Sequence, residues 1–260
     1  MDRYPLPIAD RGQRPLISLH EKEEGMVFAM VQAVRDGPSF LVENGGNGMN
    51  VIFGCSDFAE KLAYLLIQTG VSVDAFTADK DYFDYEKKNS IPVIPYEELR
   101  EKSLDVNLYL AVGYRRMNRG REEIYQRAKR DGFQIASFIH PSAVVSTEKM
   151  GEGNLIFEQA VVGPYAELGH CNVCYPKALI AHHTKVGSFN FFAISSSVAG
   201  HVRVGNRCFF GNNCCTREGI AVADETLVGA GAYVSKDTEV SDCIVPAQSI
   251  TLGEKSCELI

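Results

Sequence analysis

The sequence contains no tryptophan, no apolar run of the roughly 18 residues that a transmembrane helix needs, and no excess of positive charge. A formal net charge of −7 over 260 residues argues against sequence-independent binding to nucleic acid and against binding to an anionic membrane. The N-terminal stretch MDRYPLPIADRGQRP lacks the basic-then-apolar layout of a signal peptide. We therefore expect a cytoplasmic protein with neither nucleic-acid nor membrane partners.

A metal-binding cysteine framework is also missing, although the chain has eight cysteines. Cys171 and Cys174 form a single C-x-x-C, and no second pair or histidine follows at the spacing of a zinc finger. Cys174 falls on an apolar position of the repeat described below, and Cys208 and Cys214 fall on its small-residue positions. We therefore expect small buried cysteines and no metal.

The first part of the chain divides into two segments. Residues 1–48 have no clear periodicity, and we assign this extension no role. Residues 49–140 alternate apolar strand patterns (50–54, 71–79, 107–113 and 133–141) with helical patterns (55–70 and 118–132). Such alternation predicts a small, mostly parallel α/β sheet of the Rossmann-like kind. Its first strand–helix turn, GCSDFA, has Gly54 and Ser56 where free backbone amides face an anion in other proteins, a weak signal by itself.

The next segment carries a six-residue repeat. From Val144 to Val240, sixteen of the seventeen residues at steps of six are apolar or cysteine, and Thr216 is the exception. Glycine often follows this position, and the fourth residue after it is often small. A hexapeptide period predicts a parallel β-helix with triangular coils of about 18 residues. We expect it over residues 141–245, with a C-terminal tail at 246–260.

The two-domain order and several stretches resemble one family of bacterial enzymes. These stretches are VIFGCSDFAEKL, AFTAD, LAVGYRRMNRGREEIY, IHPSAVVS and the run that begins AHHTKVG. Over residues 49–245 the chain resembles nucleotide-sugar acyltransferases that join a Rossmann-like domain to a left-handed β-helix. Sialic-acid O-acetyltransferases and UDP- or dTDP-amino-sugar N-acetyltransferases are members. The resemblance implies a homotrimer with active sites between subunits, acetyl-CoA or another acyl-CoA as co-substrate, a nucleotide-linked amino sugar as acceptor, and a place in surface-polysaccharide biosynthesis.

The resemblance places the general base on His182. A neutral imidazole can take the proton that an amine or hydroxyl loses as it attacks a thioester. Many members have an acidic residue next to the base, where this chain has His183, which would orient His182, contact the acceptor or serve the subunit interface. Gly200 follows His182 by one full coil, at the position where the family supplies a backbone N–H to the oxyanion and to CoA.

Further binding residues are implied by the same resemblance. The positions that match sugar-nucleotide contacts are Ser56, Asp79 and Gly113. The positions that match backbone contacts to CoA are Asn212, Gly229 and Ala230, together with Gly200.

Three alternatives stay open at this point. The same base would serve O-acetylation of a sugar hydroxyl. A zinc enzyme of the γ-carbonic anhydrase type also uses a left-handed β-helix, but it needs three histidines that converge across a subunit interface, and His182, His183 and His201 do not reproduce its spacing. A non-catalytic module that binds sugar nucleotides is the third. The sequence leaves the sugar, the nucleotide, the acyl group and the choice between amine and hydroxyl undetermined.

Overall fold

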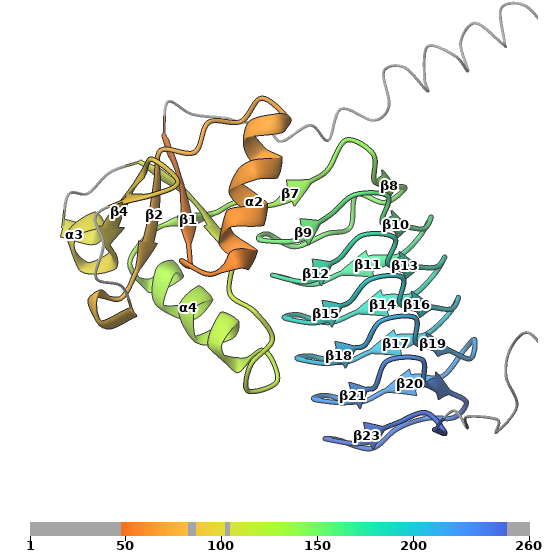
Figure 1. Ribbon diagram of the computed structural model, residues 1–260. Coiled ribbons are helices and arrows are strands. Elements are labelled where there is room, and N and C mark those ends of the chain that lie inside the picture. Colours follow the sequence, from red (N-terminus) through yellow and green to blue (C-terminus); the bar gives the residue numbers. More distant parts are fainter. Residues whose placement is uncertain (1–47, 83–86, 102–104, 249–260) are drawn as a thin grey trace, which may run out of the picture. The chain divides into compact units, whose positions relative to one another are not determined.

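The computed structural model describes residues 48–82, 87–101 and 105–248, all within one compact unit of the chain, Val42–Ile260. Figure 1 shows an α/β part followed by a stack of short strands. The predicted fold class is therefore confirmed. Most of the expected N-terminal extension and residues 249–260 of the expected tail lie outside the described residues. Among the described residues, every helix is too short or too polar to cross a lipid bilayer.

The α/β part is a six-stranded sheet with helices. Its elements are β1 (Met49–Phe53), α2 (Asp57–Gln68), β2 (Ala75–Ala78), η1 (Lys80–Tyr82), β3 (Lys87–Lys88), β4 (Ile91–Pro95), α3 (Tyr96–Glu101), β5 (Val106–Leu110), α4 (Arg119–Arg130) and β6 (Gln134–Ile135). The strand order is β3-β4-β2-β1-β5-β6, and only the β3–β4 pair is antiparallel. Central strand β1 is buried on both faces, which is why it reads as a continuous apolar run. β3, β4 and α3 were not predicted from the sequence.

The β-helix is built from very short strands. They are β7 (Phe138–Ile139), β8 (Val144–Val145), β9 (Leu155–Ile156), β10 (Val161–Val162), β11 (Glu167–Leu168), β12 (Val173–Cys174), β13 (Leu179–Ile180), β14 (Lys185–Val186), β15 (Phe191–Phe192), β16 (Ser197–Val198), β17 (Arg203–Val204), β18 (Phe209–Phe210), β19 (Cys215–Thr216), β20 (Ala221–Val222), β21 (Leu227–Val228), β22 (Tyr233–Val234) and β23 (Cys243–Ile244). All pairs are parallel; Leu179, for example, lies opposite Ser197, the equivalent residue of the next coil.

These strands form three sheets, which we call faces 1, 2 and 3. Face 1 has the order β22-β19-β16-β13-β10-β8, face 2 has β11-β14-β17-β20, and face 3 has β23-β21-β18-β15-β12-β9-β7. The second residue of each strand points into a common core, so that Val162, Ile180 and Val198 stack one coil apart and are almost fully buried. Cys174, Cys208 and other small residues fill the remaining space of this core.

The repeat phase fails at both ends of the β-helix. Val144 and Val240 were expected on the axis, but they are 57% and 67% exposed. Val162 lies opposite Val145 instead of Val144, so the first coil is shorter than the repeat and Val145 turns inward. Leu227 lies opposite Cys243 instead of Val245, so the last coil is shorter as well.

The expected strand over residues 133–141 is also two strands. β6 completes the α/β sheet beside β5, and β7 already pairs with β9 on face 3. The chain therefore passes from the α/β sheet to the β-helix within a very short connection, and the coil begins before residue 141.

The expectation of small buried cysteines holds for the β-helix interior. Cys171, Cys174, Cys208 and Cys214 are buried, whereas Cys215 and Cys243 are exposed. Burial raises the pKa of the Cys174 thiol to about 12, which keeps it protonated and inert near neutral pH.

A buried arginine joins helix α4 to the β-helix. Arg121 is 0% exposed. Its guanidinium donates hydrogen bonds to the carbonyl oxygens of Cys171 and Phe189, both at 2.9 Å, and to that of Val112 at 2.9 Å. Burial lowers the pKa of Arg121 to about 10, and the group stays charged under physiological conditions. Since the acceptors lie on two consecutive coils and on the loop after β5, this side chain fixes α4 at the corner between faces 2 and 3.

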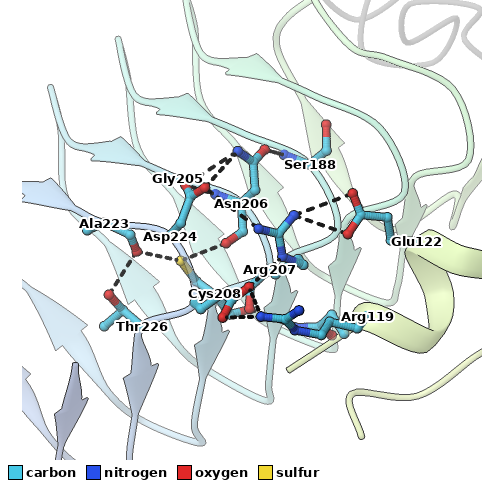
Figure 2. A network of polar contacts seen from close by, with 12 residues as sticks. Arg119, Glu122, Ser188, Gly205, Asn206, Arg207, Cys208, Ala223, Asp224 and Thr226 are labelled. Carbon is cyan, nitrogen blue, oxygen red and sulfur yellow. Dashed lines mark hydrogen bonds and ion pairs between the residues drawn. The ribbon is translucent and has the colours of Figure 1, made fainter. Parts of the chain in front are cut away.

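Ion pairs also join α4 to the β-helix (Figure 2). Arg207 lies 3.1 Å from Glu122 and 3.0 Å from Glu225, and Arg119 lies 2.6 Å from Glu225. Because these groups are partly exposed, we expect each pair to contribute little compared with Arg121.

We expect Arg121→Met to lower the free energy of unfolding by roughly 3 kcal/mol or more, because it leaves several buried carbonyl groups without a donor. Arg130→Met, on the exposed side of α4, should change it by less than about 0.5 kcal/mol. Urea denaturation of the full chain checks both values. Equal stability of the two variants would show that Arg121 does not hold α4 in place.

Candidate active site

His182 and His183 lie at the corner where face 1 meets face 2, between β13 and β14. We call this the histidine corner. The α/β part contacts face 3, where Phe58 of α2 meets the rings of Tyr175 and Phe191. In a triangular coil the histidine corner is opposite face 3, so His182 lies on the side away from the α/β part.

Gly200 lies directly against the imidazole of His182, as the repeat predicts. A Cβ atom at position 200 would come within 2.6 Å of His182 Cε1 and 2.8 Å of His182 Nε2. These distances leave no space for a side chain. The imidazole can occupy its present position because residue 200 is a glycine and has no side chain.

The backbone around Gly200 is held by its neighbours. The Gly200 carbonyl accepts a hydrogen bond from Gly219 N, and His201 N donates to the His182 carbonyl. Ala199 N donates to Oγ1 of Thr216, the one polar residue among the repeat positions. Within the described part of the chain, the Gly200 N–H has no hydrogen-bond acceptor. The corner thus combines a fixed backbone with an available donor beside His182.

A ladder of rings runs along the same corner. Tyr165, His183 and His201 each occupy the left-handed backbone region, with φ of 60°, 57° and 57°. The ring centroids of Tyr165 and His183 are 4.7 Å apart, and those of His183 and His201 are 4.8 Å apart and nearly parallel. This stacking holds His183 between two coils.

His182 and His183 also contact each other through Nδ1 atoms 3.1 Å apart. In this hydrogen bond one Nδ1 carries the hydrogen and donates, and the other accepts through its lone pair. If His182 donates, its Nε2 carries the lone pair and can accept a proton. The pair therefore couples the tautomer of His182 to that of its neighbour.

The three residues predicted to contact the sugar nucleotide follow adjacent strands. Ser56 comes after β1, Asp79 after β2 and Gly113 after β5, so all three lie at the carboxyl edge of the sheet. This edge is where open α/β sheets usually bind ligands. Asp79 Oδ1 lies 2.6 Å from Nη2 of Arg127 on α4, and that guanidinium lies 4.2 Å from the ring centroid of Tyr96. The expected Asp79 contact with a ligand therefore competes with an existing ion pair.

Tyr114 at this edge was not predicted from the sequence. It directly follows Gly113, is 53% exposed, and contacts the rings of Phe191 and Phe209 on face 3. The signal was present, because Phe191 and Phe209 occupy the same outward position on consecutive coils, which marks an aromatic stripe. Tyr114 thereby connects the carboxyl edge of the α/β sheet with face 3.

Asn212, Gly229 and Ala230 lie at a different corner from His182. They follow β18 and β21, where face 3 meets face 1, and we call this the Asn212 corner. Their backbone groups take part in the coil itself: Gly229 N donates to the Ile244 carbonyl, and the Asn212 carbonyl accepts from Gly231 N. Within one chain, the structure does not bring these residues together with the histidine corner.

A groove of about 510 Å³ lies between α4 and the corner of faces 2 and 3, and its lining includes Tyr125, Lys129, His170 and Arg207. No predicted site residue lines it. Its cations are already paired, for example Lys129 with Glu152 at 2.9 Å. We therefore place the candidate site at the histidine corner.

Comparisons with known proteins agree with this fold. Residues 201–236 match the family described as hexapeptide repeat of succinyl-transferase. The acetyltransferase domain of PglB from Neisseria gonorrhoeae has a similar structure, with 25% sequence identity and a TM-score of 0.68, over 77% of this chain and 97% of that one. No curated protein sequence matches the chain.

GDP-perosamine N-acetyl transferase from Caulobacter crescentus is also similar. A mutant with one histidine replaced by alanine, in complex with CoA and GDP-perosamine, has 28% identity and a TM-score of 0.70, over 77% of this chain and 95% of that one. The chain thus has the architecture of the left-handed β-helix acetyltransferases that carry an α/β domain, which confirms the resemblance recognised in the sequence.

Proposed function

We propose that the chain is an acyl-CoA-dependent N-acyltransferase that transfers an acyl group, most simply acetyl, to the amino group of a nucleotide-linked amino sugar. The observation that carries the proposal is the imidazole of His182 held against Gly200, beside an available backbone N–H. The likeness to an enzyme that was crystallised with CoA and GDP-perosamine supports this class of substrates. Surface-polysaccharide biosynthesis is the process that such a product would serve.

In the proposed reaction, the amine nitrogen attacks the thioester carbonyl while His182 Nε2 takes the amine proton. The tetrahedral oxyanion accepts a hydrogen bond from the Gly200 N–H. The C–S bond then breaks, and the imidazolium returns its proton to the CoA sulfur. The new amide bond and free CoA are the products.

A homotrimer would complete the site. Asn212, Gly229 and Ala230, three of the four residues proposed for CoA, lie at the Asn212 corner, while the fourth, Gly200, and the proposed base lie at the histidine corner of the same chain. Packing the Asn212 corner of one subunit against the histidine corner of the next would bring the two sets together. The sugar nucleotide would be held at the carboxyl edge of the α/β sheet, near Ser56, Asp79 and Gly113.

His183 has the geometry of a positioning residue. Its Nδ1 accepts a hydrogen bond from His182 Nδ1–H in the tautomer that leaves the lone pair on His182 Nε2 free. We expect His183→Ala to lower kcat roughly tenfold or more, with little change in the KM for acetyl-CoA. The reason is that His182 loses the hydrogen bond that fixes its tautomer and its orientation. The side-chain oxygen of asparagine can also accept a hydrogen bond from His182. Partial recovery of kcat in His183→Asn would therefore be specific to this positioning role. Unchanged kcat in His183→Ala would contradict it.

The overall proposal is tested by a CoA-release assay with acetyl-CoA and a panel of GDP-, UDP- and dTDP-linked amino sugars. Matched nucleotide sugars with a hydroxyl in place of the amine serve as controls. We expect release with at least one amino sugar and none with its hydroxyl counterpart. Release with the hydroxyl sugars alone would instead establish O-acetylation.

A further inference from the structure

We propose that His182, His183 and His201 form a zinc-binding site and that zinc bound there inhibits acyl transfer. The inhibition of acyl transfer by zinc rests on the proposed role of His182 as base, whereas the binding of zinc does not. His201 enters the site because the repeat places it one coil after His183, with the two ring centroids stacked at 4.8 Å. The site is distinct from a metal cofactor site, since the proposed reaction uses no metal.

The donor set suits a borderline transition metal. Each histidine offers one nitrogen, and the ligand atoms of the three residues all lie within 4.8 Å of one another. Neutral imidazoles favour Zn²⁺, Cu²⁺ and Ni²⁺ over Mg²⁺ or Ca²⁺, which prefer oxygen. Three protein ligands leave a fourth tetrahedral position for water.

The geometry needs only side-chain adjustment. Tetrahedral zinc with Zn–N bonds of about 2.0–2.1 Å separates its ligand nitrogens by about 3.4 Å. The Nδ1 atoms of His182 and His183 are already 3.1 Å apart. His201 must tilt out of its parallel stack with His183 so that its lone pair points to the ion. Within a single chain all three residues are exposed, so their rings can rotate without disturbing the core.

Zinc at this site would disable the base whichever nitrogen of His182 it takes. A neutral imidazole has one nitrogen with an in-plane lone pair, and the other nitrogen carries the proton. Coordination uses the lone pair, so the bound ring cannot accept a proton from the amine. Loss of activity should therefore follow zinc occupancy.

The test combines isothermal titration calorimetry with the CoA-release assay on the full chain without a histidine tag. Cys215 and Cys243, which are exposed, and Cys257 are replaced by serine in every protein so that thiols do not compete. We expect one zinc ion per chain, inhibition that follows binding, recovery with a chelator, and no effect of Mg²⁺.

His201→Asn is the decisive variant, and His170→Asn, at another corner, is its matched control. We expect His201→Asn to weaken zinc binding and inhibition roughly tenfold or more, with inhibition measured against the variant's own zinc-free rate. Unchanged zinc affinity in His201→Asn would overturn the site. Zinc that saturates the cluster without slowing CoA release would overturn the inhibition and the base role of His182. Calorimetry needs no catalytic turnover, so it tests whether zinc binds at the three histidines even if no acceptor sugar is found.

Discussion

We expect His182→Asn to lower kcat for acyl transfer by roughly 10²–10⁴-fold, the usual contribution of a general base. Asparagine keeps a polar side chain of similar length, but it cannot take a proton from the attacking amine. The KM for acetyl-CoA should change little, because Asn212, Gly229 and Ala230 lie at the Asn212 corner and Gly200 is proposed to contact CoA through its backbone. Steady-state CoA release with an accepted amino sugar measures both quantities.

The matched control is His140→Asn. His140 is a β-helix histidine remote from the histidine corner, and its Nδ1 lies 2.8 Å from Ser142 Oγ. We expect this variant to retain the full rate. If both variants lose activity equally, the loss reflects damage to the coil, and if neither does, His182 is not the base.

Gly200→Ala should also remove most of the activity while the chain remains folded. The added Cβ would fall 2.6 Å from His182 Cε1, and the imidazole is the exposed end of a side chain that can swing away. The backbone at residue 200 does not need a left-handed conformation, so alanine itself is tolerated there. Because the base would be displaced by about 1 Å, we expect a loss of roughly 10²-fold in kcat.

Gly120→Ala is the control for this substitution. Gly120 lies in the first turn of α4, and a Cβ there would meet nothing closer than 3.8 Å. Alanine is the better helix former by up to about 1 kcal/mol, so this variant should be fully active and at least as stable. Thermal denaturation shows whether Gly200→Ala also keeps the parent Tm within a few degrees. A large drop in Tm would mean that the contact with His182 serves the fold, and full activity would contradict the proposed arrangement.

The sequence predicted the β-helix and the contact of His182 with Gly200 because both follow from a constant repeat. Residues one coil apart in a regular β-helix lie one above the other, so the contact needs no knowledge of the side chains. The same reasoning failed at Val144 and Val240, because the first and last coils are shorter than the repeat. The repeat pattern in the sequence does not show at which residues the number of residues per coil changes.

Other features of the structure depend on contacts between residues far apart in the chain, and a periodic pattern in the sequence does not predict such contacts. The burial of Arg121 results from carbonyl groups on two coils that happen to face α4. The ion pair of Asp79 with Arg127 joins residues far apart in the chain. Within one chain, Asn212 and His182 lie at different corners of the coil, so the active site between subunits that the resemblance implies stays a prediction.

The central claim is that this chain forms an amide on a nucleotide-linked amino sugar. The most direct measurement incubates the full chain with acetyl-CoA labelled in its carbonyl carbon and with GDP-, UDP- or dTDP-linked amino sugars, then locates the label in the product by NMR spectroscopy. The account predicts label in an amide carbonyl attached to the sugar nitrogen, with an equal amount of free CoA. Label in an ester on a sugar hydroxyl, or in free acetate alone, would contradict it.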